Sequence, residues 1–152
     1  MLSVAIRPSR FSYHLVNAAR EFVVNIPRAD QVAEVDFAGV CSGADHDKFA
    51  ELGFTAQPSA HVSAPLIAEC PINIECRVAQ TLVRPIHTVF LGEVVAVHAS
   101  EGFLREGVPD VARIEPIFYA PDPSQGKHVH SYWTLGERIG RAFEIGKGLK
   151  KG

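Results

Sequence analysis

The feature that most constrains the fold of this chain is a long β-branched run near its middle. Residues 87–97 read HTVFLGEVVAV, and in places this segment carries apolar side chains on both faces. That pattern is typical of a central strand in a barrel or a sandwich. Just upstream, residues 72–78 alternate apolar and polar side chains, which predicts a second strand. The simplest topology pairs these two strands antiparallel, through a turn at residues 83–86.

Shorter patterns along the chain add further strands and a few short helices. Residues 2–6 alternate with period two, and Pro8 ends that strand because proline has no N–H to donate. We predict further strands at residues 22–26, 111–119 and 128–130, and short helices at residues 13–22, 30–38, 47–53 and 135–140. The pattern therefore predicts a mainly β, antiparallel fold with a few short inserted helices.

Size and composition favour one globular domain that spans residues 1–152. The chain is 47% hydrophobic and is long enough to bury a core without disulfides or a metal. Its net charge of −2 argues against a nucleic-acid partner, which requires a basic surface. No apolar run approaches the roughly eighteen residues of a membrane span, and no secretory signal is visible. The odd number of cysteines indicates reduced thiols in a cytoplasmic protein, with Cys70 and Cys76 in the core.

The first ten residues predict an anion site. The strand at residues 2–6 leads directly into Arg7, Ser9 and Arg10, and Ser12 stands at the start of the expected helix. Arginine forms bidentate bonds to phosphate oxygens, and the unpaired N–H groups of a helix start point the same way. The alternative is that Ser12 only caps the helix and that both arginines are solvated.

A second stretch, CSGADHDKF at residues 41–49, offers a loop that is able to close over a phosphate. Ser42 and Gly43 open the loop, and Lys48 follows it. The glycine and lysine spacing differs from that of a P-loop, and the alternative is a capped surface helix. His128 and His130 lack a third ligand, so we predict no metal site.

Five segments occur in an order that resembles a known family. They are AIRPSR before a helix, EFVVNIP, the Ser-Gly loop with DKF, ECPINIEC and HTVFLGEVV. This order resembles the flavin reductase-like, flavoredoxin-type family, whose members bind FMN on a split β-barrel. The resemblance covers about residues 1–97, with a weaker similarity in the segments YW and LGERIG near the end.

The resemblance implies a Greek-key-like split β-barrel with FMN bound non-covalently near a homodimer interface. It assigns the phosphate contacts to Arg7, Ser9 and Arg10, with Ser42 and Lys48 closing from the second loop. This assignment agrees with the anion site that the residues predict by themselves.

The resemblance also implies residues around the flavin ring. His87 would lie near the isoalloxazine or the nicotinamide pocket, whereas the residues alone also allow a simple polar strand start. Tyr132 and Trp133 would cover the ring from the partner subunit, and the alternative is that both are core aromatics.

The implied chemistry is hydride transfer from NAD(P)H to the flavin, as in a flavin reductase. One alternative is a flavoredoxin-like electron carrier that a protein partner reduces, and another is a β-barrel dimer without flavin. Family members carry a strand and a loop before the strand that is found here at residues 2–6. We therefore expect this domain to be truncated at its N-terminus.

Overall fold

The computed structural model describes residues 1–149 of the chain, which form two compact units. The first unit is Met1–Ile117, and the second begins at Phe118. The first unit contains the elements β1 Leu2–Ile6, α1 Phe11–Ala19, β2 Glu21–Ile26, η1 Ala29–Gln31, α2 Val32–Val40, α3 Lys48–Leu52, β3 Ala56–Gln57, β4 Leu66–Ile67, β5 Ile72–Val83, β6 Thr88–Ala99, η2 Glu101–Phe103, β7 Leu104–Arg105, β8 Val108–Pro109 and α4 Val111–Ile114. The prediction of a single domain over residues 1–152 stays a prediction.

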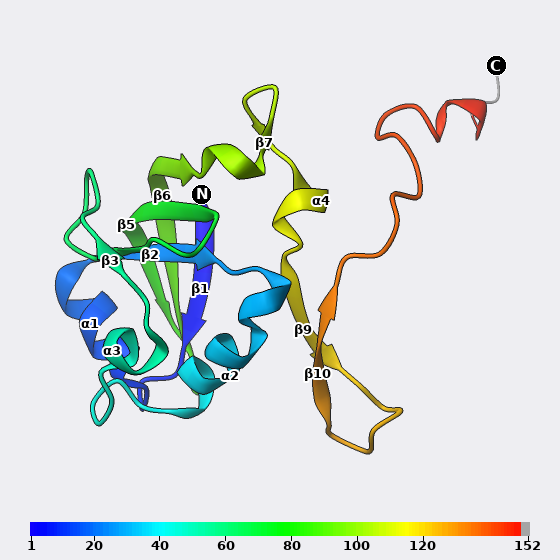
Figure 1. Ribbon diagram of the computed structural model, residues 1–152. Helices are drawn as coiled ribbons and strands as arrows, with labels where there is room; N and C mark the ends of the chain where they lie inside the picture. Colours follow the sequence, from blue (N-terminus) through cyan, green and yellow to red (C-terminus); the bar gives the residue numbers. More distant parts are fainter. Residues whose placement is uncertain (150–152) are drawn as a thin grey trace. The chain divides into compact units, whose positions relative to one another are not determined.

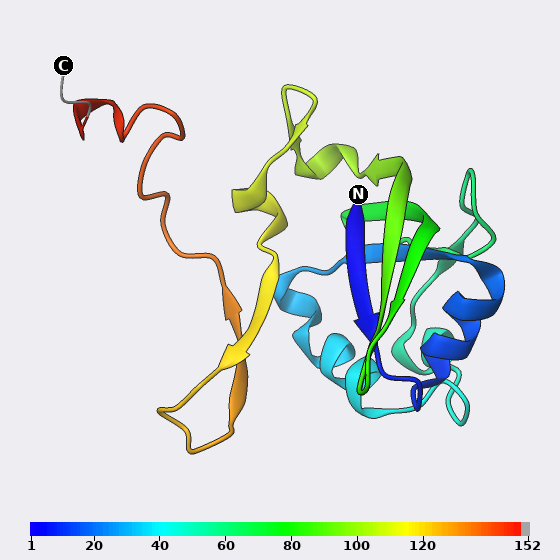
Figure 2. The same cartoon turned by 180° about the vertical axis from the view of Figure 1, so that it is seen from behind.

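A curled antiparallel sheet with the strand order β1-β6-β5-β2 dominates the first unit (Figures 1 and 2). The predicted hairpin is confirmed, since β5 and β6 pair antiparallel along their length and Arg84 N donates to His87 O at 2.9 Å across the turn. β6 lies between β1 and β5, so the prediction of a central strand is also confirmed. The mainly β, split-barrel fold class therefore holds for this chain.

The inner face of the sheet forms the core with α1. Val16, Phe22, Cys76 and Phe90 are buried together, and alternate residues of the strands pack around them. Gly92 on β6 allows the closest approach, because a Cβ there would lie 2.6 Å from the Phe22 ring. A larger residue at this position would overpack the core.

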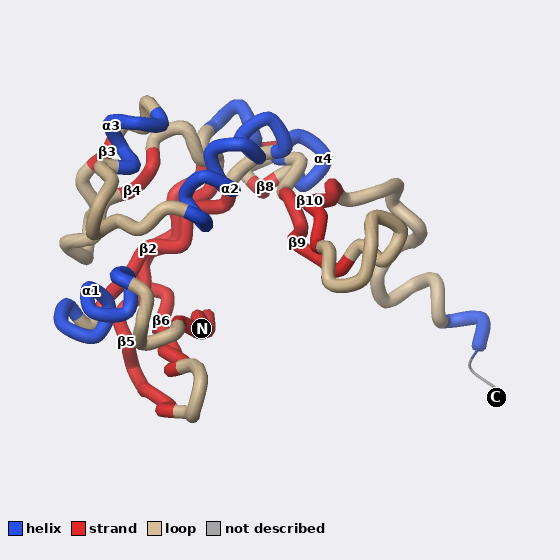
Figure 3. The backbone as a smooth tube through the Cα atoms, turned by 90° about the horizontal axis from the view of Figure 1, so that it is seen from below, coloured by secondary structure: helices blue, strands red, loops and turns tan. Residues whose placement is uncertain are grey.

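The helices α1, α2 and α3 lie around the lower end of β1 in Figure 1. In Figures 1 and 2, α1 and α2 lie on opposite sides of the point where β1 ends. Seen from below, α1 lies beside β5, whereas α2 and α3 lie beyond β2 (Figure 3). None of the helices among residues 1–149 is long and apolar enough to cross a membrane.

Several predicted boundaries differ from the observed ones. α1 begins at Phe11, two residues before the expected start, because Arg10 in extended conformation serves as its N-cap. The strand predicted at residues 111–119 divides into α4 and a later strand, β9 Ile117–Pro121, since Glu115 adopts a left-handed conformation between them. The helix predicted at residues 135–140 is wrong, because that segment has no regular structure.

A two-stranded hairpin of β9 Ile117–Pro121 and β10 His130–Thr134 lies in the second unit except for its first residue, and η3 Lys147–Leu149 follows it. The strand predicted at residues 128–130 begins only at His130, since His128 has a φ of 71° and lies in the turn. On this hairpin the rings of Tyr119 and His130 stack with centroids 5.0 Å apart.

Candidate anion-binding site

Four of the predicted site residues line one pocket at the lower end of β1. Ser9, Arg10, Ser42 and Lys48 surround a cavity of about 490 Å³. Val4 and Ile6 of β1 form its apolar wall, together with the first turn of α1, the end of α2 and the loop that follows α2. We call this pocket the cradle. It contains two cations and three serine hydroxyls, because Ser12 lines it as well.

The start of α1 contributes further donors to the cradle. Arg10 is the N-cap of this nine-residue helix, and no side chain caps it. The N–H groups of a first helical turn have no partner within the helix. The carbonyl of Arg10 accepts from Tyr13 N at 3.0 Å, which closes the first turn around the cradle wall. The alternative role of Ser12 as N-cap is therefore wrong, and Ser12 sits inside the helix.

The second loop is shaped by Ser42 and Lys48. Ser42 Oγ accepts from Ala44 N at 3.2 Å, and its carbonyl accepts from Asp45 N and His46 N at 3.1 Å. Lys48 Nζ donates to Ala38 O, in the last turn of α2, at 2.5 Å. A lysine there complements the negative end of the helix dipole and is held at the cradle. The donor set as a whole fits a phosphate-sized anion.

Arg7 does not line the cradle. Along β1, Val4 and Ile6 face the core, and period two turns Ala5 and Arg7 to the opposite face of the sheet. There Arg7 Nε donates to His87 Nε2 at 3.4 Å.

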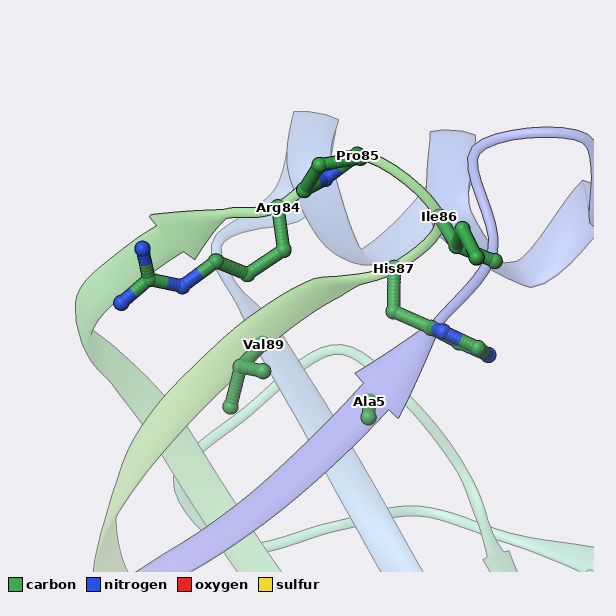
Figure 4. Close-up of a pocket in the computed structure, with 6 residues that line it drawn as sticks. All are labelled: Ala5, Arg84, Pro85, Ile86, His87 and Val89. Atoms are coloured by element: carbon green, nitrogen blue, oxygen red, sulfur yellow. The ribbon is translucent and has the colours of Figure 1, made fainter.

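A shallow hollow of about 480 Å³ lies beside His87. Ala5 and Val89, which are paired on β1 and β6, form its floor, and the turn between β5 and β6 forms one side (Figure 4). In this view the Arg84 side chain points away from the His87 ring. The hollow is almost wholly apolar, apart from its two basic side chains.

Tyr132 and Trp133 belong to β10 in the second unit. The Tyr132 ring lies 5.5 Å from the Tyr119 ring, and Trp133 is about half exposed. Their predicted place over a flavin ring stays a prediction.

A buried carboxylate that the sequence analysis did not single out lies on β5. Glu75 is fully buried and accepts from Ala60 N at 2.8 Å, His61 N at 2.7 Å and Val62 N at 3.1 Å. His98 Nε2 contacts the same carboxylate at 2.6 Å. Burial alone would raise the pKa of Glu75, but the bonds from Ala60 N, His98 and His61 N outweigh it and lower that pKa to about 2.

Two features of the sequence together could have indicated this carboxylate: polar residues on a strand, and a neighbouring loop whose backbone N–H groups lack partners. Polar residues alternate along the first half of β5, and residues 54–65 have few ladder partners of their own. Glu21 accepts from Ser63 N at 2.6 Å, and Arg77 donates to His61 O at 2.8 Å. With Glu75, three side chains therefore bind the backbone of the same loop. A run of unpaired backbone donors next to a strand with carboxylates predicts such bonds.

The cysteines match their predicted state. All three are free thiols, and Cys70 and Cys76 are buried as predicted. Burial raises the pKa of Cys70 to about 11, which keeps it protonated. Cys41 lines the cradle. Within residues 1–149, no cluster of His, Cys, Asp and Glu side chains is arranged to hold a metal ion.

Comparisons with known proteins identify the fold and its relatives. The model of the flavin reductase like domain matches residues 1–121. Flavoredoxin from Methanosarcina acetivorans superposes with a TM-score of 0.87 and 32% identity, over 97% of this chain and 75% of that one. Flavoredoxin of Desulfovibrio vulgaris (Miyazaki F) superposes with a TM-score of 0.83 and 32% identity, over 95% and 76%.

An uncharacterized protein of Archaeoglobus fulgidus is 38% identical over 111 residues, which cover 73% of this chain. The matched region spans only 62% of that relative's length.

Proposed function

We propose that this chain, which belongs to the flavin reductase-like domain family, binds FMN non-covalently with its phosphate in the cradle. The observation that carries the proposal is the convergence of Ser9, Arg10, Ser42 and Lys48 on one pocket at the uncapped start of α1. Two separate stretches of sequence thus supply the donors that a phosphate monoester needs.

We assign His87 to the ring end of the flavin. Arg7 precedes Ser9 by two residues and donates to His87 beside the apolar hollow, which supports this assignment. FMN supplies hydride and electron transfer when bound, and the residues of this chain bind and orient it. The homodimer, with Tyr132 and Trp133 of a second copy over the ring, is part of the same proposal.

The first test is the affinity for FMN of an Arg10→Ala variant. We expect the Kd for FMN to rise at least about tenfold, because one charge-assisted bond to the phosphate is lost. Riboflavin, which has no phosphate, should bind both proteins equally well. Isothermal titration calorimetry measures both ligands, with Arg138→Ala as the matched control of an exposed arginine in the second unit. Unchanged FMN binding by Arg10→Ala would remove the phosphate assignment.

The proposed activity is reduction of the bound flavin by NAD(P)H. A second candidate is an electron carrier that a protein partner reduces, favoured by the 32% identity to two flavoredoxins. Anaerobic stopped-flow mixing of the FMN-loaded protein with NADH, and separately with NADPH, distinguishes them. A reductase loses its oxidised-flavin absorbance much faster than free FMN does under the same conditions. Bleaching no faster than that of free FMN would favour the carrier.

A further inference from the structure

His46 joins the second loop of the cradle to the helices on either side of that loop. Its backbone N–H donates to Ser42 O at 3.1 Å, within the turn that shapes the loop. Its ring packs edge-on against the Phe37 ring of α2, with centroids 5.9 Å apart. Its Nδ1 contacts the two carboxylate oxygens of Glu51, on α3, at 3.1 and 3.0 Å. One residue therefore contacts three segments, each through a different group.

The position of Lys48 depends on what holds α3 in place. Lys48 is the first residue of α3, which has only five residues, and a helix this short is not stable by itself in water. The bond from Lys48 Nζ to Ala38 O is one restraint, but a phosphate in the cradle competes for the same ammonium group. The side chain of His46 does not line the cradle, so its contacts restrain α3 without using a donor that the phosphate needs.

The contact with Glu51 is available in both protonation states of His46. A neutral imidazole with its proton on Nδ1 donates one hydrogen bond to the carboxylate, and a protonated imidazole adds the attraction of opposite charges. Both side chains are about two-fifths exposed, so this attraction is modest. Further charged side chains lie in the surrounding segments: Asp45, Asp47 and Lys48, which line one hollow together with His46, and Asp36, next to Phe37 on α2.

We propose that His46 is a positioning residue for phosphate binding, which holds Ser42 and Lys48 at the cradle by fixing their loop to α2 and α3. The inference rests on the proposed function, because it takes the cradle as the flavin phosphate site. His46 itself does not line the cradle, so it acts through the loop and not on the ligand.

The first test is calorimetric titration of FMN and of riboflavin into His46→Ala. We expect the Kd for FMN to rise about three- to fivefold, because the contacts that order the loop are lost, and the Kd for riboflavin to change less than about twofold. Glu51→Ala should give a similar loss, and the double variant no more than the larger single loss, because both residues act through one contact. His14→Ala is the matched control, since His14 is an exposed histidine of α1 that does not line the cradle.

A second test uses pH and the variant His46→Asn, whose amide nitrogen can take the place of Nδ1. At pH 8 the amide and a neutral imidazole each donate one hydrogen bond to Glu51, so the FMN affinity should be nearly that of wild type. At pH 5.5, where an imidazole is ordinarily protonated, only wild type gains the attraction of charges, and His46→Asn should bind FMN about threefold more weakly. The titration of the FMN phosphate affects both proteins alike, so the ratio of the two Kd values isolates the imidazole. A ratio that is the same at both pH values would overturn the proposal.

The Arg10→Ala variant separates this inference from the proposed function. If Arg10→Ala weakens FMN binding but His46→Ala does not, the role of His46 is overturned and the proposed function stands. Equal weakening of FMN and riboflavin in His46→Ala would overturn that role as well, because the loss would then not depend on the phosphate. If neither variant changes the FMN affinity, both the positioning role and the phosphate assignment are overturned.

Discussion

At the scale of single residues, Glu75 illustrates how one buried charge organises a segment without regular structure. The carboxylate accepts three consecutive backbone N–H groups of the loop between β3 and β4, and His98 contacts it from β6. A buried carboxylate is costly unless such donors surround it. Glu75 thus fixes this loop against the outer side of β5, whereas the cradle depends on charges that remain partly exposed.

Glu75→Gln should lower the free energy of unfolding by roughly 2–4 kcal/mol at pH 7, because an amide cannot accept all of these donors. The folded-state pKa of Glu75, about 2, lies below its ordinary value of 4.5. The stabilisation is therefore complete above pH 4.5 and is lost as the pH falls towards 2. Urea unfolding at pH 7 and pH 3 should show the gap between wild type and variant narrowing at the lower pH.

Glu93→Gln is the matched control for this measurement, because Glu93 is an exposed carboxylate on β6. It should leave the free energy of unfolding nearly unchanged at both pH values. A gap between wild type and Glu75→Gln that stays constant from pH 7 to pH 3 would contradict the role assigned to the ionised carboxylate.

At the scale of elements, local patterns predicted the strands better than the helix ends. The β5–β6 hairpin follows from period-two alternation and a β-branched run, both of which are local properties. The helix predicted at residues 135–140 rested on a short segment with two glycines, Gly136 and Gly140, which weaken a helix. The early start of α1 reflects Arg10, which the residue preferences for N-caps do not favour.

The sequence predicted the separate segments of the anion-binding site, but only partly predicted how the fold brings them together. The Ser9–Arg10 and Ser42–Lys48 segments each indicated an anion by composition, but only the packing of α1 against the loop after α2 brings them together. Arg7 was predicted at the site but does not line the cradle. The alternation of β1 already places Arg7 on the face away from Val4 and Ile6. The buried role of Glu75 depends on the loop 13 to 15 residues before it, and the alternation of β5 alone does not show which polar residue that loop covers.

At the scale of the whole molecule, the apolar core belongs to the first unit. Among the residues whose exposure the structure describes, every buried apolar side chain precedes Phe118. The second unit has a two-stranded hairpin, with the exposed rings of Phe118, Tyr119 and Trp133. A hairpin of two strands is only marginally stable in water by itself. The two units should therefore differ in local stability.

Hydrogen exchange followed by mass spectrometry tests this difference on the intact chain. Amides of β9 and β10 should exchange at least roughly a hundredfold faster than those of β5 and β6, because opening the hairpin exposes no buried apolar core. The paired amides of β1 are the internal control, since this strand is at the edge of the sheet but packs Val4 and Ile6 against the core. Their exchange rates should lie between those of the β9–β10 hairpin and those of β5 and β6. Equal protection of β9 and β6 would show that the hairpin draws its stability from packing against another surface, of which a second copy of the chain is the first to test.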